Sequence, residues 1–165
     1  MKEIEKYDVI CIDNGYNYIF FSVGNKGLIR KAAQFTESSI NRIYQFRFGD
    51  VNNYTEEIDD NAVSNNNDTI KVLNTIVWIL YDFISKKPNC LVRLSGITYS
   101  RTRLFSLWLT SNWDYANKIF VLFGSKSDEI WEKYRYGTHY NAIIIKKRIE
   151  DRKSTRLNSS HRIRS

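Results

Sequence analysis

The chain has 165 residues, of which 42% are hydrophobic and 15% aromatic, enough to build one globular core. Its formal net charge is +7, from 25 Lys/Arg and 18 Asp/Glu residues. The longest continuous apolar run, from Ile76 to Tyr81, is far shorter than the roughly 20 residues of a membrane-spanning helix. The first twenty residues also lack the long uncharged segment of a secretory signal. We therefore expect a soluble, cytoplasmic protein of one domain with no membrane contact.

Most of the positive charge lies in residues 151–165. These residues carry five of the Lys/Arg and one of the acids, so the net charge of residues 1–150 is only +3. The segment has two apolar residues and no periodic face, which is typical of disorder. Asp151 to His161 resembles a translated sequencing adapter. We treat residues 151–165 as a disordered, artefactual tail and residues 1–150 as the single domain, although a basic arm for nucleic acid has a similar composition.

The N-terminal part predicts four antiparallel strands. The pair Asn14-Gly15 suits the positive φ angles of a hairpin turn between two segments rich in β-branched and aromatic residues. In the last strand, aromatic residues alternate with Gln45 and Arg47, which indicates one buried and one polar face. The expected strands span residues 7–12, 17–23, 28–36 and 42–48.

A polar segment and a long apolar helix follow. Residues 49–67 contain three Asp, two Glu and six Asn, with little periodicity, so we predict a long loop of the kind that is often functional. Asp68 or Asn67 then caps a helix whose apolar residues recur at helical spacing up to Pro88, which ends it. Its apolar stripe is wide, and this predicts the most buried element of the chain.

The rest of the chain alternates between strands and helices. We predict strands at 90–94, 119–123 and 140–149. A helix capped by Ser100 follows the first of them, and a short helix from Ser127 or Asp128 to Tyr134 follows the second. The predicted fold class is α+β: a four-stranded antiparallel meander followed by α-β-α-β-α-β, with the helices packed on a mixed sheet.

Several short motifs resemble a known family. They are Phe48-Gly49-Asp50, Asp59-Asp60, the segment 64–68, Lys71-Val72-Leu73, Gly96-Ile97-Thr98 and Arg101-Thr102-Arg103-Leu104. Together they resemble a family of small bacterial proteins, the domain of unknown function DUF6934, over residues 7–149. The resemblance implies a bacterial α+β domain and supplies no established activity, ligand or catalytic residue. Ile97 departs from it, because we expect a small hydroxylated residue there that would donate to an anion.

The best candidate site is the start of the second predicted helix. Arg101 and Arg103 lie in its first turn, where the helix dipole disfavours cations, and Arg93 lies on the preceding strand. A bound phosphate or carboxylate would resolve that conflict, with Thr98 and Ser100 as further donors.

Two alternatives remain open for these arginines. They pair with the acidic loop, through Asp50, Asp59 or Asp60, or they are simply solvated. Under the binding hypothesis, Asp60 would orient them.

A metal site is the second candidate. Asp50, Asp59, Asp60 and Asp68 carry oxygen ligands suited to Mg²⁺ or Mn²⁺, and a neighbouring arginine would stabilise a phosphoryl transition state. Asp68 is equally suited to capping the helix. His139 has no Ser, Cys or acid at a diagnostic spacing, so we predict no catalytic residue and no cofactor.

Aromatic residues and cysteines allow two further predictions. Tyr16, Tyr18, Phe20 and Phe21 either stack nucleic-acid bases on an open sheet or belong to a core, and a net charge of +3 favours the core. The two cysteines, at positions 11 and 90, have no metal-binding spacing and are expected to be buried thiols.

The working hypothesis is a non-enzymatic binding or interaction domain. Its partner would be a protein or a phosphate-bearing ligand held between residues 50–68 and the second helix, within a bacterial defence or toxin–antitoxin cassette. The alternative is a metal-dependent nuclease or phosphotransferase that uses the acidic loop with Arg101 and Arg103.

Overall fold

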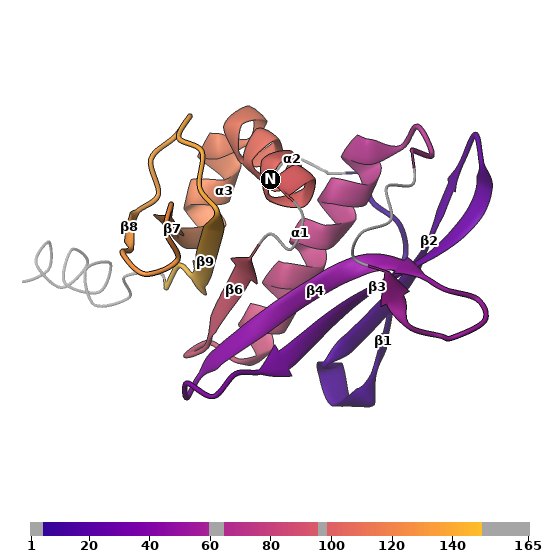
Figure 1. Ribbon diagram of the computed structural model, residues 1–165, viewed down its shortest axis with the longest axis horizontal. Coiled ribbons are helices and arrows are strands. Elements are labelled where there is room, and N and C mark those ends of the chain that lie inside the picture. Colours follow the sequence, from indigo (N-terminus) through magenta and orange to yellow (C-terminus); the bar gives the residue numbers. More distant parts are fainter. Residues whose placement is uncertain (1–4, 60–64, 96–98, 150–165) are drawn as a thin grey trace, which may run out of the picture.

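The computed structural model describes residues 5–59, 65–95 and 99–149. Within these ranges the chain forms three α-helices and a mixed sheet of nine strands, and the helices lie together on one side of the sheet (Figure 1). The predicted α+β class is therefore confirmed. None of the helices described is long and apolar enough to cross a membrane.

The first four strands form the predicted antiparallel meander. They are β1 (Ile10–Ile12), β2 (Asn17–Gly24), β3 (Gly27–Glu37) and β4 (Ile43–Val51), paired in that order. A 3-10 turn, η1 (Asp13–Gly15), joins the first two. Asn14 and Gly15 have φ angles of 57° and 93°, so the positive φ expected from this pair is confirmed.

The helix α1 (Thr69–Lys86) connects two parallel strands. It leads from the β4 region to β6 (Leu91–Ser95), which pairs parallel to β4. A parallel pair needs such a crossover, because a short turn cannot return the chain in the same direction. Nine residues of α1 are buried, and Phe83 stacks on Phe35 of β3 at 3.8 Å between ring centroids.

The C-terminal half completes the sheet in the order β4-β6-β9-β7-β8. Its elements are α2 (Tyr99–Ser111), α3 (Trp113–Ile119), β7 (Phe120–Ser125), β8 (Glu132–Lys133) and β9 (Ala142–Lys147). The prediction of a helix starting at Ser127 or Asp128 is wrong. Asp128 has a φ of +67°, and its backbone N–H donates to the Ser125 hydroxyl. The third helix lies earlier in the chain, at α3.

Two smaller differences concern element boundaries. The predicted loop at 49–67 includes the end of β4 and a short strand, β5 (Ile58–Asp59), which pairs with it. The second helix begins at Tyr99, so Ser100 lies in its first turn and is not its cap.

The burial of the aromatic residues of β2 decides whether they could stack nucleic-acid bases. Tyr18 and Phe20 are fully buried among the helices, and the Tyr18 hydroxyl donates to Asp82 of α1 at 2.8 Å. Tyr16 is partly buried against the same core, whereas Phe21 lies on the other face. Tyr18 and Phe20 are therefore core residues and not a stacking platform.

The two cysteines differ in environment. Cys90 is buried as expected, whereas Cys11 is exposed, so its predicted burial is wrong. Cys11 lies on β1, a three-residue edge strand whose residues are all exposed. Burial also raises the pKa of the Cys90 thiol, which disfavours the reactive thiolate.

We predict that one thiol per folded chain reacts rapidly with a disulfide reagent such as DTNB at pH 8. The second thiol should react only on unfolding, because Cys90 is buried and its thiolate is disfavoured. A stopped-flow measurement of released thionitrobenzoate gives both rates, and Cys11→Ser should remove the fast phase. Two fast thiols, or none, would contradict this assignment.

Candidate functional site

One edge of β4 pairs with two strands, β5 and β6. On this edge, β6 pairs with β4 as far as Gln45 and Arg93, and β5 pairs with it from Asp50 and Asp59. Because β6 runs parallel to β4 and β5 runs antiparallel, both strands point toward residues 46–49 from opposite ends.

The chain therefore leaves Asp59 and Ser95 at neighbouring points on this edge. With the same register Ser95 would lie opposite Arg47, three residues before Asp50, although the paired residues themselves end at Gln45 and Arg93. Three residues of a strand span roughly 10 Å. The acidic segment after β5 and the turn before α2 thus start from the same part of the sheet.

A glycine allows β5 to approach β4 closely here. A Cβ atom added to Gly49 would lie 2.4 Å from the carbonyl oxygen of Asp59, much closer than real Cβ contacts come. Any side chain at position 49 would therefore push β5 away and widen this part of the sheet.

A groove of about 570 Å³ adjoins this edge on the face of the sheet that points away from the helices. Its lining residues on β2 and β3, such as Ile19 and Gln34, alternate with the core residues Tyr18, Phe20, Ala33 and Phe35, as side chains on opposite faces of a strand must. Arg30, Gln34 and Arg47 supply donors, and Ala32 forms part of its lining.

Both arginines of the groove contact the segment that connects β4 to β5. Arg30 forms an ion pair with Glu56, and Arg47 donates through Nη2 to the carbonyl oxygen of Ile58 at 3.4 Å. These contacts place residues 56–58 along one side of the groove. Sequence reasoning identified Arg47 as outward-facing but did not assign Arg30 or Gln34 to a site, although their i, i+4 spacing on a strand was the available signal.

The residues of the predicted anion site are described in part. Arg93 forms an ion pair with Asp128 and donates to the amide oxygen of Gln45 at 3.0 Å, and Arg103 is exposed on α2. Asp60 and Thr98 lie outside the described residues, as do the side chains of Ser100 and Arg101. The pairing of these arginines with the acidic loop stays a prediction.

The predicted metal ligands have separate partners. Asp50 forms an ion pair with Lys31 at 2.5 Å. The Nζ atom of this lysine also lies 5.6 Å from the ring centroid of Phe48. Asp59 is directly opposite Asp50 in the β4–β5 ladder. The ammonium of Lys31 already supplies a positive charge beside Asp50, so a divalent cation there would have to displace it. Across residues 5–59, 65–95 and 99–149, no group of three His, Cys, Asp or Glu side chains is arranged to hold a metal.

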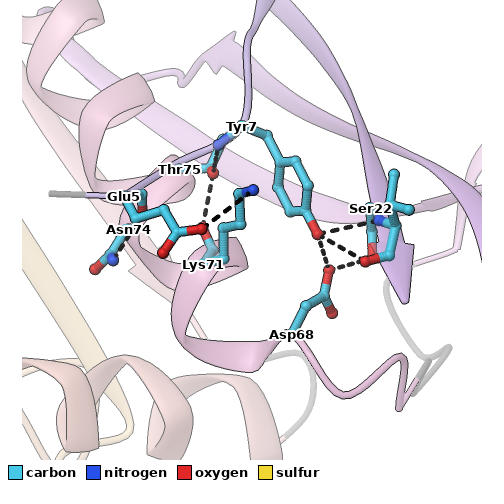
Figure 2. A network of polar contacts seen from close by, with 8 residues as sticks. Glu5, Tyr7, Ser22, Asp68, Lys71, Asn74 and Thr75 are labelled. Atoms are coloured by element: carbon cyan, nitrogen blue, oxygen red, sulfur yellow. Dashed lines mark hydrogen bonds and ion pairs between the residues drawn. The ribbon is translucent and has the colours of Figure 1, made fainter. Parts of the chain in front are cut away.

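Asp68 belongs to a structural network (Figure 2). It occupies the N-cap position of α1, but its side chain makes no capping bond. Its carboxylate accepts hydrogen bonds from the hydroxyls of Tyr7, at 2.6 Å, and Ser22, at 2.5 Å. Asn66 donates to the same Ser22 hydroxyl at 2.9 Å. This network fastens the segment before β1 and the start of α1 to β2.

The N-terminal segment is held at two further points. The backbone N–H of Tyr7 donates to the Thr75 hydroxyl at 2.9 Å, and Asn74 donates to the carbonyl of Glu5 at 2.9 Å. Lys71 forms an ion pair with Glu5 at 3.4 Å. Together with the bond from Tyr7 to Asp68, these contacts hold the chain ahead of β1 against α1. The position of Asp68 in the sequence did not reveal this role.

The comparisons with known proteins give one match. Residues 3–148 match the family described as "Family of unknown function (DUF6934)". The chain belongs to this family. No curated protein and no solved structure matches it. The resemblance seen in the sequence motifs is thus confirmed, and the family's description assigns no activity.

We predict that Tyr7→Phe lowers the free energy of unfolding by about 1 kcal/mol, the usual net value of a hydrogen bond. The substitution removes the hydroxyl that donates to Asp68 and accepts from the Val23 N–H. Urea unfolding followed by circular dichroism measures the change. Tyr54→Phe is the matched control, because Tyr54 is 97% exposed.

The difference in unfolding free energy between wild type and Tyr7→Phe should also depend on pH. Burial and the hydrogen bond to Asp68 raise the pKa of Tyr7 above its ordinary value of 10.0. The protonated hydroxyl therefore stabilises the fold below pH 10, and this contribution is lost as the pH rises through the raised pKa. The difference in the free energy of unfolding between wild type and Tyr7→Phe should be constant just below pH 10 and should shrink above it. A difference that grew above pH 10 would contradict the network.

Proposed function

We propose that the protein is a non-enzymatic binding domain that holds an anionic group of its partner at the edge of β4. The surface would include Arg93, Thr98, Ser100, Arg101 and Arg103, with Asp60 orienting the arginines. The supporting observation is the convergence of β5 and β6 on residues 46–49, from which both halves of this surface depart.

Charge and chemistry support binding over catalysis. Arg47 and Arg93 both lie at this edge, with Arg47 donating to the Ile58 carbonyl and Arg93 paired with Asp128, and guanidinium groups suit carboxylate or phosphate oxygens. Two of the described acids nearby already have basic partners: Asp50 is paired with Lys31 and Glu56 with Arg30. Such a surface recognises an anion without a nucleophile or a general base.

We predict that inorganic phosphate shifts the backbone amide signals of Arg47, Arg93 and Arg103 in a ¹⁵N–¹H titration of the full chain. Arg101→Ala and Arg103→Ala should each weaken the apparent affinity about tenfold, since each removes one charge-assisted contact. Arg135→Ala is the control, because Arg135 is an exposed arginine paired with Glu132.

Residue-resolved shifts separate this site from the basic tail. Signals that move only within residues 151–165 would overturn the proposed site. Equal weakening by Arg135→Ala would show that general charge, and not this surface, attracts the phosphate.

The rival function is a metal-dependent nuclease or phosphotransferase. One observation favours it: Asp50 and Asp59 face one another across the β4–β5 ladder, as paired carboxylate ligands would. The ion pair between Asp50 and Lys31 opposes it.

We predict that the full chain does not cleave single- or double-stranded DNA or RNA with Mg²⁺ or Mn²⁺ present, as followed on denaturing gels. Because Lys31 neutralises Asp50, the carboxylates should hold a divalent cation poorly. Metal-dependent cleavage that disappears in both Asp60→Ala and Arg101→Ala would establish the enzyme and end the binding-only proposal.

A bacterial defence or toxin–antitoxin cassette stays the expected biological setting. The fold and the family match leave this expectation as a prediction about the neighbouring genes.

A further inference from the structure

A second surface, at the junction of α2 and α3, has the opposite chemistry. A pocket of about 730 Å³ lies where α2 ends and α3 begins. Trp113, Tyr115 and Tyr136 supply aromatic walls, and Asp114 supplies the single carboxylate. No Lys or Arg is among the residues that line it. We call this surface the aromatic pocket.

The rings of the aromatic pocket are held in place by the core. Trp113 stacks on buried Tyr134 at 5.7 Å between centroids, with an angle of 26°. Tyr134 in turn contacts the fully buried Tyr140 at 5.0 Å. Tyr136 meets Trp113 at 6.0 Å and 63°, although it is 58% exposed. The two rings thus form a fixed corner that is open to solvent.

The electrostatics of the corner favour a cation. The faces of aromatic rings carry negative potential, and Trp gives the strongest cation–π attraction. Asp114 has no ion-pair partner in the described part of the chain, and Lys118, one turn later on α3, is not paired with it. The last carbonyl groups of α2 carry a partial negative charge and the first N–H groups of α3 a partial positive one, so the full negative charge at this junction comes from Asp114.

Other aromatic rings of this protein are already covered by its own lysines. Lys6 lies 4.5 Å from the ring centroid of Trp78, and Lys71 lies 4.4 Å from that of Tyr7. Further lysines lie over Tyr16, Tyr44 and Tyr81. In residues 99–149 and the other described ranges, no Lys or Arg lies over Trp113, Tyr115 or Tyr136. The aromatic pocket is therefore equipped for a cation that the described chain does not itself supply.

We propose that the aromatic pocket binds an alkylammonium group, with the cation over the rings of Trp113 and Tyr136 and the carboxylate of Asp114 balancing its charge. This binding site is independent of the proposed anion site on β4. It also differs in ligand class, since it takes a positively charged, weakly hydrated group such as a quaternary ammonium.

The test is a ¹⁵N–¹H titration of the full chain with tetramethylammonium chloride, followed through the indole N–H signals of its four Trp residues. Trp113→Phe assigns the signal of Trp113. Sodium chloride at equal concentration controls for ionic strength, and tert-butanol serves as an uncharged molecule of similar shape. We expect saturable shifts of the Trp113 signal, with an affinity for tetramethylammonium at least tenfold above that for tert-butanol. The signal of Trp78 should stay unchanged, because Lys6 already covers that ring.

Surface variants keep the proposal testable if substitutions of Trp113 unfold the protein. Asp114→Asn and Tyr136→Leu change exposed residues, and each should weaken tetramethylammonium binding severalfold, whereas Trp78→Phe should not. Equal affinities for tetramethylammonium and tert-butanol would show an apolar patch and overturn the proposal. So would shifts that sodium chloride reproduces, or full binding in Tyr136→Leu.

Discussion

The burial of α1 against the sheet is the constraint on which the rest of this structure depends. Phe83 lies face to face with Phe35 at 3.8 Å, and Leu80 and Ile84 are fully buried beside it. Because α1 must cover the meander, the chain returns to the edge of β4 and continues as a parallel strand. That crossover places β6 on the same edge of β4 as β5, on the far side of residues 46–49. The same helix anchors α2, since Trp108 donates to Asn74 at 2.8 Å.

Two surfaces of opposite chemistry follow from this arrangement. The edge of β4 carries Arg47 and, on the paired strand β6, Arg93, whereas the junction of α2 and α3 gathers aromatic rings beside one carboxylate. Each surface rests on core elements: the first on strands, the second on the buried rings of Tyr134 and Tyr140. Rigid support of this kind lowers the entropic cost of binding, because the recognising groups are already ordered.

Polar contacts between distant segments account for the residues whose roles the sequence obscured. Asp68 occupies the N-cap position of α1, yet its carboxylate accepts hydrogen bonds from Tyr7 and Ser22, which are distant from it in the chain. Asp50 lies in a run of acids that suggests a metal, yet its partner is a lysine on the neighbouring strand. A buried carboxylate is stabilised by the hydrogen-bond donors that lie next to it, and the fold decides which donors those are. The sequence thus pointed to Asp50 and Asp68 as polar residues of interest, and the fold shows which donors each of them meets.

The sequence alone determined the class of fold, the four-strand meander, the hairpin turn at Asn14-Gly15 and the extent of α1, because these depend on local backbone preferences and on the period of apolar residues. The grouping of Arg93, Arg101 and Arg103 around one turn stays a prediction, since residues 96–98 lie outside the described residues. The tertiary structure decided the position of the third helix, the exposure of Cys11 and the order of the strands. It alone brought the end of β5 to the end of β6, and Tyr136 to Trp113. These contacts join residues that are distant in the chain, and no local preference encodes which distant partner a side chain will meet.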